Sequence, residues 1–451
     1  MATSIVKAKY LIIGNSAGGI AAAEAIREVD KAGEIAIVSD EPYPAYSRPL
    51  ISEYLASRRP LEKMLFRPAD FYERNSIRTF LGKKAQCLDT DEHVIQLESG
   101  ERVIGEKLLL ATGGLPIIPP VKGVDRSGVF TFTTLDDAKT IDQFLSESPN
   151  RRARAVVIGG GLIGISVTEA LVKRGVGATI VEMKERILNT ILDEEASALE
   201  EAALRQAGVE IITSHTVASI DSYYSAGDVT GMTLDDGRPK PCELVIVAIG
   251  VRPCTDLAIG TGIKVNRGIV VDRHMATSSP DIYACGDVAE TYDLVYHDNR
   301  LNPTWPNAYI GGRVAGFNMA GVPTEYEGGT AMNSLKYFGL AVASAGIVNP
   351  PDNSYEVLSN KYDHTYKKVA LKDGVIVGMV FIGDIEKSGI IFSLIKERVK
   401  ADSFKQTLVA EDFGLASLPE KLWRARLGMP TSGFISPTTI REPPKELVLG
   451  E

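Results

Sequence analysis

The stretch VIGGGLIG at residues 157–164 decides the fold, because its glycines stand between an apolar run and a helical pattern. The preceding RAVVI is typical of a buried parallel strand, and the LIGISVTEALVKRG that continues the motif has helical periodicity. Gly159, Gly161 and Gly164 have the GxGxxG spacing. In such a turn the first two glycines let the backbone approach a pyrophosphate, and the third lets the helix pack on the strand. We therefore expect the N-terminus of this helix to bind a dinucleotide.

The next predicted strand, GATIVE, ends at Glu182. A carboxylate at this point can hold both ribose hydroxyls and would repel a 2′-phosphate, so NADH is favoured over NADPH. Lys184 and Arg186 follow closely, and their positive charges would soften this preference. The other expected contacts of this nucleotide are Leu162, Ile163, Arg186 and Gly250.

A second phrase, IIGNSAGG at residues 12–19, resembles the first but departs from the fingerprint, which here reads Gly14, Ser16, Gly19. Serine is small enough to permit close approach of a ligand, at some steric cost. The strand that follows the helix ends near Asp40 and Glu41, either of which can serve as the ribose carboxylate. Taken alone, this phrase is also compatible with a strand–turn–helix that binds nothing, although nucleotide binding is favoured.

The bulk composition limits the possible partners. A chain of 451 residues is too long for one core and divides into two or three domains. Its formal net charge of −9 disfavours nucleic acid and anionic membrane surfaces as partners. We find no apolar run near the ~20 residues of a membrane span. The opening MATSIVKAKY leads directly into the first strand and leaves no room for a secretory signal, so we expect a cytoplasmic protein.

The cysteines and histidines do not form a metal site in the sequence. Cys87, Cys242, Cys254 and Cys285 stand apart, and none belongs to a CxxC pair. The five histidines are equally scattered. Redox chemistry would therefore use a bound organic cofactor or the metal of a partner.

Three further motifs follow in order: ERVIGEKLLLATGG (101–114), ELVIVAIGVRP (243–253) and SPDIYACGDVAE (279–290). With both glycine-rich turns in place, the chain resembles the flavoprotein pyridine-nucleotide disulfide oxidoreductase superfamily over roughly its whole length. The resemblance implies an α/β fold with two Rossmann-like dinucleotide-binding domains, one for FAD and one for NAD(H), and a C-terminal α+β interface domain. It divides the chain into an FAD domain at 1–115 and 249–323, an NAD domain at 116–248, and an interface domain at 324–451 with an extended tail from about Leu427.

The resemblance also assigns the FAD contacts. Asp287 of the GD motif would bind the ribityl chain, and Arg48 would pair with phosphate. A helix starting near Asn307 would aim its positive N-terminus at the isoalloxazine. The full expected set is Gly14, Ser16, Gly18, Gly19, Asp40, Glu41, Arg48, Ala85, Ala111, Thr112, Gly113, Gly286, Asp287, Pro306, Asn307 and Ala308.

The segment DEPYPAYSRPLISEYL (40–55) holds no cysteine where disulfide reductases of the superfamily carry theirs. It resembles the cysteine-free branch of rubredoxin and ferredoxin reductases, the nitrite reductase flavin module and apoptosis-inducing-factor-like proteins. This branch implies hydride transfer between NADH and flavin and electron transfer between flavin and an iron–sulfur protein, with either overall direction allowed. An NADH oxidase and a redox-gated NADH-binding protein remain alternatives. A homodimer or a place in a hetero-complex is expected.

Glu53 and Ser166 depart from the ferredoxin-reductase pattern, in which a lysine and a glutamate form an ion pair beside the flavin. A lone Glu53 carboxylate there would disfavour reduced flavin and suit a low-potential, ferredoxin-like partner. The alternative is that Glu53 is protonated or turned to solvent. These two residues are the expected catalytic positions.

Overall fold

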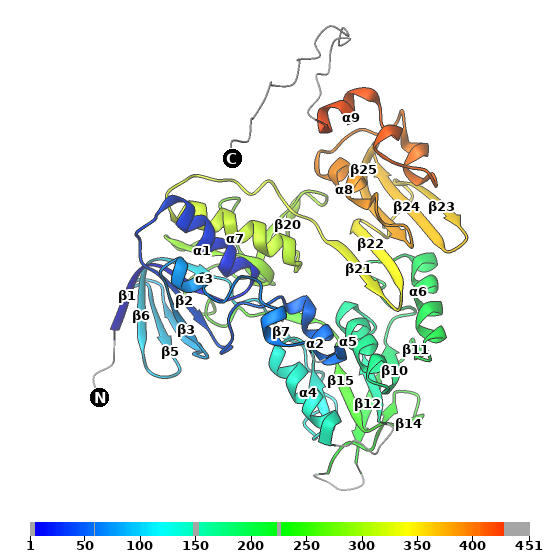
Figure 1. The fold of residues 1–451 in the computed structure, drawn as a ribbon, viewed down its shortest axis with the longest axis horizontal. Coiled ribbons are helices and arrows are strands. Elements are labelled where there is room, and N and C mark those ends of the chain that lie inside the picture. Colours follow the sequence, from blue (N-terminus) through cyan, green and yellow to red (C-terminus); the bar gives the residue numbers. More distant parts are fainter. Residues whose placement is uncertain (1–4, 58, 148–152, 223–226, 428–451) are drawn as a thin grey trace, which may run out of the picture.

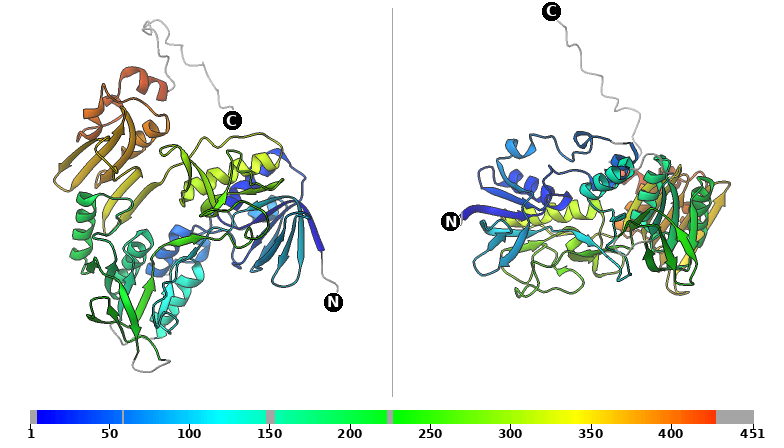
Figure 2. Two further views of the ribbon diagram at one scale, coloured as in Figure 1. Left: turned by 180° about the vertical axis from the view of Figure 1, so that it is seen from behind. Right: turned by 90° about the horizontal axis from the view of Figure 1, so that it is seen from below.

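The computed structural model describes residues 5–57, 59–147, 153–222 and 227–427. The predicted tail beyond Leu427 lies outside the described residues. Figures 1 and 2 show two sheets built mainly from parallel strands, each with its helices, and a C-terminal unit. This arrangement confirms the predicted α/β class. No helix among the described residues is both long and apolar enough to cross a membrane.

The first sheet is built from both ends of the predicted FAD region. Its parallel part has the order β3-β2-β1-β6, with β18 on the other side of β6, and a β4–β5 hairpin continues from β6. Helices α1 and α7 lie side by side against it (Figure 1). The elements are β1 (Ile5–Ile13), α1 (Ala17–Val29), β2 (Ile35–Ser39), α2 (Ile51–Ser57), α3 (Phe71–Arg74), β3 (Ile77–Leu81), β4 (Ala85–Asp89), β5 (Val94–Leu97), β6 (Arg102–Leu110), β18 (Ile282–Ala284) and α7 (Trp305–Met319). A small sheet of β17 (Ile269–Val270), β19 (Ala289–Asp293) and β20 (Asp298–Leu301) stands beside it.

The second sheet is wholly parallel, with the order β11-β10-β9-β15-β8. Its central strands are continuous buried apolar runs because helices cover both faces of such a sheet. The elements are β8 (Val129–Thr131), α4 (Leu135–Glu147), β9 (Arg154–Ile158), α5 (Leu162–Lys173), β10 (Gly177–Glu182), α6 (Glu194–Gln206), β11 (Glu210–Thr213) and β15 (Leu244–Val247). A side sheet contains β12 (Val217–Asp221), β13 (Gly231–Leu234) and β14 (Pro239–Pro241).

Two short antiparallel strands join these sheets, β7 (Gly114–Pro116) and β16 (Val251–Pro253). The chain leaves the first sheet through β7 and returns through β16. The expected domain changes at 115 and 249 fall at or next to these strands.

The C-terminal unit is an antiparallel sheet with the order β21-β22-β25-β24-β23. Asp373 and Gly374 both have positive φ and form the tight turn between β24 and β25, as two-residue hairpin turns require. The helix predicted from KSGIIFSLIKERVK forms, and it ends at Lys396. The elements are β21 (Met332–Tyr337), β22 (Leu340–Gly346), β23 (Glu356–Tyr362), β24 (Thr365–Lys372), β25 (Val375–Ile382), α8 (Ser388–Lys396) and α9 (Glu420–Arg426).

Strand β24 fastens this unit to the second sheet through α6. The Tyr366 hydroxyl donates to Asp193 at 2.7 Å, and the Lys368 ammonium contacts the same carboxylate oxygen at 2.8 Å. Tyr366 and Lys368 share one face of the strand because side chains alternate. Asp193 in turn caps α6 by accepting from the Ala196 N–H at 3.1 Å. All three side chains are buried or nearly so, so the contact is part of the interior.

Candidate cofactor site

One continuous cavity of about 1290 Å³ lies between the two parallel sheets. This volume exceeds the roughly 300–1,000 Å³ of a pocket for one small ligand. The cavity is therefore better suited to two dinucleotides than to one. Its lining residues lie between Ile13 and Ala308, and they include both glycine-rich turns. The carboxyl ends of β1 and β9 both open into it, where open α/β sheets bind their ligands.

The first turn needs glycine at two positions for reasons internal to the chain. Gly14 has φ +125°, and a Cβ there would lie 2.1 Å from the Ala111 carbonyl oxygen. A Cβ at Gly19 would lie 2.0 Å from the Gly14 carbonyl oxygen. The turn therefore presses α1 against the ends of β1 and β6. This close cradle suits the pyrophosphate of FAD.

The second turn repeats this construction. Gly159 has φ +108°, and a Cβ there would lie 2.4 Å from the Ala248 carbonyl oxygen. A Cβ at Gly164 would lie 2.0 Å from the Gly159 carbonyl oxygen. Gly161 has nothing within 4 Å of a Cβ, so its small size matters only to what enters the cavity.

Glu182 is held in place at the end of β10. Its carboxylate accepts from the Gly160 N–H at 2.6 Å and from the Lys184 N–H at 2.8 Å. This position supports the predicted role of Glu182 as the ribose carboxylate of NADH. Arg186 does not line the cavity, and its guanidinium lies 2.5 Å from Glu185.

The two candidate carboxylates of the first site differ in their surroundings. Glu41 accepts from the Tyr46 hydroxyl at 2.6 Å and pairs with Arg48. The Arg48 guanidinium also donates to the Thr133 carbonyl at 3.0 Å. Asp40 lines the cavity and is exposed, with no hydrogen bond or ion pair to the part of the chain that the structure describes. Asp40 is therefore the stronger candidate for the ribose of FAD.

The GD motif also lines the first site. Gly286 has φ +76°, in the region that favours glycine, and Asp287 lines the cavity. Burial raises the pKa of the Asp287 carboxyl, and the Arg48 guanidinium opposes that rise. Thr112 is oriented by donating to the Cys254 carbonyl at 2.7 Å. This part of the cavity lining offers hydroxyl and carboxyl partners to a polyol chain.

Helix α7 begins at Trp305, two residues before the predicted start. Pro303, Trp305 and Ala308 line the cavity, so the N-terminal turn of α7 faces it. Asn307 does not line it, because its amide donates to the Thr330 carbonyl at 3.0 Å instead. Trp305 escaped the sequence analysis because its ring is placed by an edge contact with Phe66, at 5.0 Å between centroids.

Most residues expected at the cofactors line the cavity. For FAD they are Gly14, Ser16, Gly18, Asp40, Glu41, Arg48, Ala85, Ala111, Thr112, Gly113, Gly286, Asp287 and Ala308, and for NAD(H) Gly159, Gly161, Leu162, Ile163, Glu182 and Gly250. The expected residues that do not line it are Gly19, Gly164, Arg186, Pro306, Asn307, Glu53 and Ser166. Gly19 and Gly164 lie underneath their turns, where they permit close packing.

Glu53 and Ser166, the two expected catalytic positions, do not line the cavity. Glu53 is on α2 with its side chain 41% exposed, and its carboxylate is 3.7 Å from the Arg59 guanidinium. Ser166 on α5 hydrogen-bonds Tyr337 of the C-terminal hairpin. These contacts support the alternative in which Glu53 is turned to solvent, and a role of these two residues beside the flavin stays a prediction. The sequence could not show this, because Arg59 lies after the end of α2, outside the helical periodicity.

Two cysteines line the cavity, Cys254 and Cys285. Burial raises the pKa of the Cys285 thiol to about 12, and burial also raises the pKa of the Cys254 thiol. Because the thiolate is the reactive form, both thiols are poor nucleophiles. The cavity thus favours direct electron transfer over a thiol relay.

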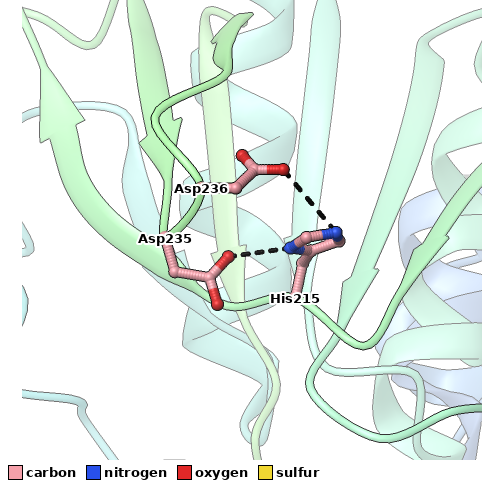
Figure 3. A group of neighbouring side chains, drawn as sticks. All are labelled: His215, Asp235 and Asp236. Atoms are coloured by element: carbon pink, nitrogen blue, oxygen red, sulfur yellow. Dashed lines mark hydrogen bonds and ion pairs between the residues drawn. The ribbon is translucent and has the colours of Figure 1, made fainter.

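His215, Asp235 and Asp236 are the group of metal-ligating side chains that the described residues bring together (Figure 3). His215 Nδ1 is 2.9 Å from Asp235, and His215 Nε2 is 3.6 Å from Asp236. Asp236 also lies 2.5 Å from the Arg238 guanidinium. These ion pairs account for the cluster, and we assign no metal to it.

Comparison with known families identifies the class to which this fold and cavity belong. Residues 8–309 match the family model for pyridine nucleotide-disulphide oxidoreductases, and the chain belongs to that family. Residues 332–399 match the model for the rubredoxin NAD+ reductase C-terminal domain. The predicted resemblance is confirmed, and the chain is an FAD-dependent NAD(H) oxidoreductase.

Individual relatives extend over most of the chain. It is 31% identical over 429 residues to NADH-dependent phenylglyoxylate dehydrogenase subunit epsilon of Aromatoleum evansii, covering 94% of this chain and 100% of the relative. It is 30% identical to NADH-rubredoxin oxidoreductase of Clostridium acetobutylicum, covering 84% and 91%. The structure of a covalent putidaredoxin reductase–putidaredoxin complex matches with TM-score 0.79 and 26% identity, covering 87% of this chain and 94% of that one. The chain spans about half the length of the Bacillus subtilis nitrate and nitrite reductase proteins that it also matches, and NADH oxidases are among its relatives.

Proposed function

We propose that this protein moves electrons between NADH and an iron–sulfur carrier protein. The observation that carries the proposal is one cavity lined by two dinucleotide turns, in which the thiols are held protonated. The named activities of the rubredoxin and putidaredoxin reductase relatives support the same class of acceptor. Bound FAD would supply the step between two-electron hydride chemistry and one-electron transfer.

The chain's own residues bind and orient the two cofactors. The N-termini of α1 and α5 would each face a pyrophosphate, where their backbone N–H groups and partial positive charge favour an anion. Asp40 and Glu182 would hold the riboses. The N-terminus of α7 would favour negative charge that develops on the ring system nearest to Trp305. These groups fix position and electrostatics, which is the protein's share of this chemistry.

The test compares acceptors one at a time, starting from protein that has been reduced under anaerobic conditions. The purified holoprotein is reduced with one equivalent of NADH and mixed in a stopped-flow instrument with ferredoxin, rubredoxin, nitrite or dissolved oxygen. We expect reoxidation of the flavin bands to be at least tenfold faster with an iron–sulfur protein than with the other acceptors. Fastest reoxidation by oxygen would instead establish the NADH oxidase alternative.

We further propose a domain division at 115/116, 248/249 and 323/324. It is supported by β7 and β16, which carry the chain between the two parallel sheets. We propose a cytoplasmic location from the four free cysteines, which are typical of reducing compartments. The full-length match to a dehydrogenase subunit supports a place in a hetero-complex, and size-exclusion chromatography of the native protein from its source would test it.

A further inference from the structure

We propose that His215 is the platform on which the adenine of NADH stacks, and that Asp235 and Asp236 hold its ring in position. His215 is thus a positioning residue for the coenzyme. The inference rests on the NAD(H) site described above, but it does not depend on which acceptor the protein uses.

The backbone places His215 beside the ribose carboxylate. The His215 N–H donates to the Glu182 carbonyl at 3.2 Å, and the neighbouring Ser214 N–H donates to the Lys184 carbonyl at 2.8 Å. His215 lines the same cavity as Glu182 and Lys184. Because the adenine is attached to the ribose that Glu182 holds, it must lie next to this loop.

The orientation of the ring decides what His215 can offer. Nδ1 is 2.9 Å from Asp235 and Nε2 is 3.6 Å from Asp236, both in the turn between β13 and β14 (Figure 3). The Asp235 N–H also donates to the Thr216 carbonyl at 3.0 Å, which ties this turn to the His215 loop. Because both ring nitrogens are directed at the carboxylates, the part of the His215 side chain that remains to contact a ligand in the cavity is the face of its ring. A fixed aromatic face stacks on a base, whereas it gives a phosphate no hydrogen bond.

Two further observations fit a base better than a charged group. Met183, the residue after Glu182, is 64% exposed and lines the same cavity, so it offers a second apolar surface. The pKa of the Asp235 carboxyl is lowered by its hydrogen bond to His215, and the pKa of the Asp236 carboxyl is lowered by its hydrogen bonds to Arg238. Both carboxylates are therefore ionised at neutral pH, and they would repel an anion. The neutral adenine avoids this repulsion.

The test compares two coenzymes that share the nicotinamide but differ in the adenosine. Flavin reduction by NADH and by reduced nicotinamide mononucleotide is followed by stopped flow in the holoprotein and three variants. In His215→Ala we expect the apparent Kd for NADH to rise about tenfold, with the limiting rate of reduction unchanged. His215→Phe keeps an aromatic face and should restore the Kd to within threefold of the native value. His364→Ala, an exposed histidine outside the cavity, should change nothing.

Reduced nicotinamide mononucleotide lacks the adenosine, so its apparent Kd and limiting rate should be the same in all four proteins. An unchanged Kd for NADH in His215→Ala would overturn the proposal. So would an equal rise for both coenzymes, or a failure of His215→Phe to restore the Kd, because each would show a structural or hydrogen-bonding role. Thermal melts of the same samples identify an unfolded variant, and Asp235→Asn then serves as the second variant, with an expected threefold rise for NADH alone. Since no acceptor protein is present, failure of the proposed iron–sulfur partner would leave these results unaffected.

Discussion

The turn at Gly14 and the turn at Gly159 place their first and last glycines in the same way, but Ser16 stands in the first where Gly161 stands in the second. Ser16 and Gly161 are both N-cap residues with extended backbone, and neither has the positive φ that requires glycine. The glycines at the ends of each turn are required by carbonyl oxygens of the chain itself. The middle position is therefore limited by the ligand, and the outer positions are limited by the fold.

The two sites also differ in what covers their helices. Gly312 and Gly316 of α7 approach α1 so closely that a Cβ would lie 2.1 Å from the Gly18 and 2.4 Å from the Ala22 carbonyl oxygens. Helix α5 instead packs on α2, and the Phe338 N–H at the tip of the C-terminal hairpin donates to its Glu169 at 2.8 Å. The helix of the first turn is thus covered by α7, whereas the helix of the second turn contacts α2 and the C-terminal hairpin.

The largest expected effect comes from replacing the first glycine of each turn, because each replacement should disable a different cofactor site. Gly14→Ala should abolish FAD binding, because positive φ costs an alanine about 1–3 kcal/mol and the Cβ also meets the Ala111 carbonyl oxygen. Gly159→Ala should keep the flavin spectrum but slow reduction by NADH at least 100-fold. Absorbance spectra and stopped-flow reduction measure both. Loss of flavin from Gly159→Ala as well would show that the two turns are not independent.

A smaller effect is expected at the ribose carboxylate. Replacing Glu182 with alanine removes the charge that repels a 2′-phosphate and leaves Lys184 at the same end of the cavity. The ratio of the kcat/KM values for NADPH and NADH should rise at least tenfold, which corresponds to about 1.4 kcal/mol. Asp40→Ala is the matched control in the first turn's site, and it should weaken FAD binding without changing the ratio. An unchanged ratio in Glu182→Ala would place the discrimination elsewhere.

Exchanging the middle residues, Ser16 and Gly161, tests directly whether this position is limited by the ligand rather than by the fold. In Gly161→Ser we expect unchanged thermal stability, because nothing lies within 4 Å of a Cβ and serine is a favourable N-cap. The Kd for NADH should rise three- to fivefold, since the side chain stands where the pyrophosphate approaches. Ser16→Gly should leave FAD binding and stability nearly unchanged. A drop of several degrees in the Tm of Gly161→Ser would mean that the fold also requires this glycine.

The smallest effect concerns α6, the helix that packs between the second sheet and the C-terminal unit. Glu200 on α6 is fully buried, and its carboxylate oxygens have no hydrogen-bond partner among the described residues. Burial and the nearby Glu169 raise the pKa of Glu200 to about 8, from 4.5. The folded protein thus keeps a proton that the unfolded chain loses above pH 4.5. The contribution of the protonated Glu200 to the free energy of unfolding is therefore fully present below pH 4.5, and it is lost as the pH rises to about 8.

Glu200→Gln should remove this dependence. Its Tm should equal that of the native protein near pH 4.5 and exceed it by on the order of 2 °C for each pH unit above, a modest shift because the chain is long. Glu194→Gln, at the exposed start of the same helix, is the control and should behave like the native protein. Parallel melting curves for native protein and Glu200→Gln across this pH range would contradict the assignment.

The sequence by itself determined the order of strands, turns and helices around both fingerprints. These signals are local: a buried strand is a continuous apolar run, and Gly14 and Gly159 each precede a helix within a few residues. It also placed Glu182 correctly at the end of its strand, where the carboxylate now accepts from Gly160. The motif order was enough to predict the class of protein, because the family is defined by that order.

Only the tertiary structure decided which groups meet across these local units. Arg59 reaches Glu53, Glu41 pairs with Arg48, and Asp235 holds His215 through contacts that no periodicity reports. The same is true of Trp305, which faces the cavity because Phe66 lies against it. Some of these partners are near in sequence and others, such as Phe66 and Trp305, are far apart, but in each case the pairing depends on how irregular segments turn and pack, which the regular spacing of a strand or helix does not encode.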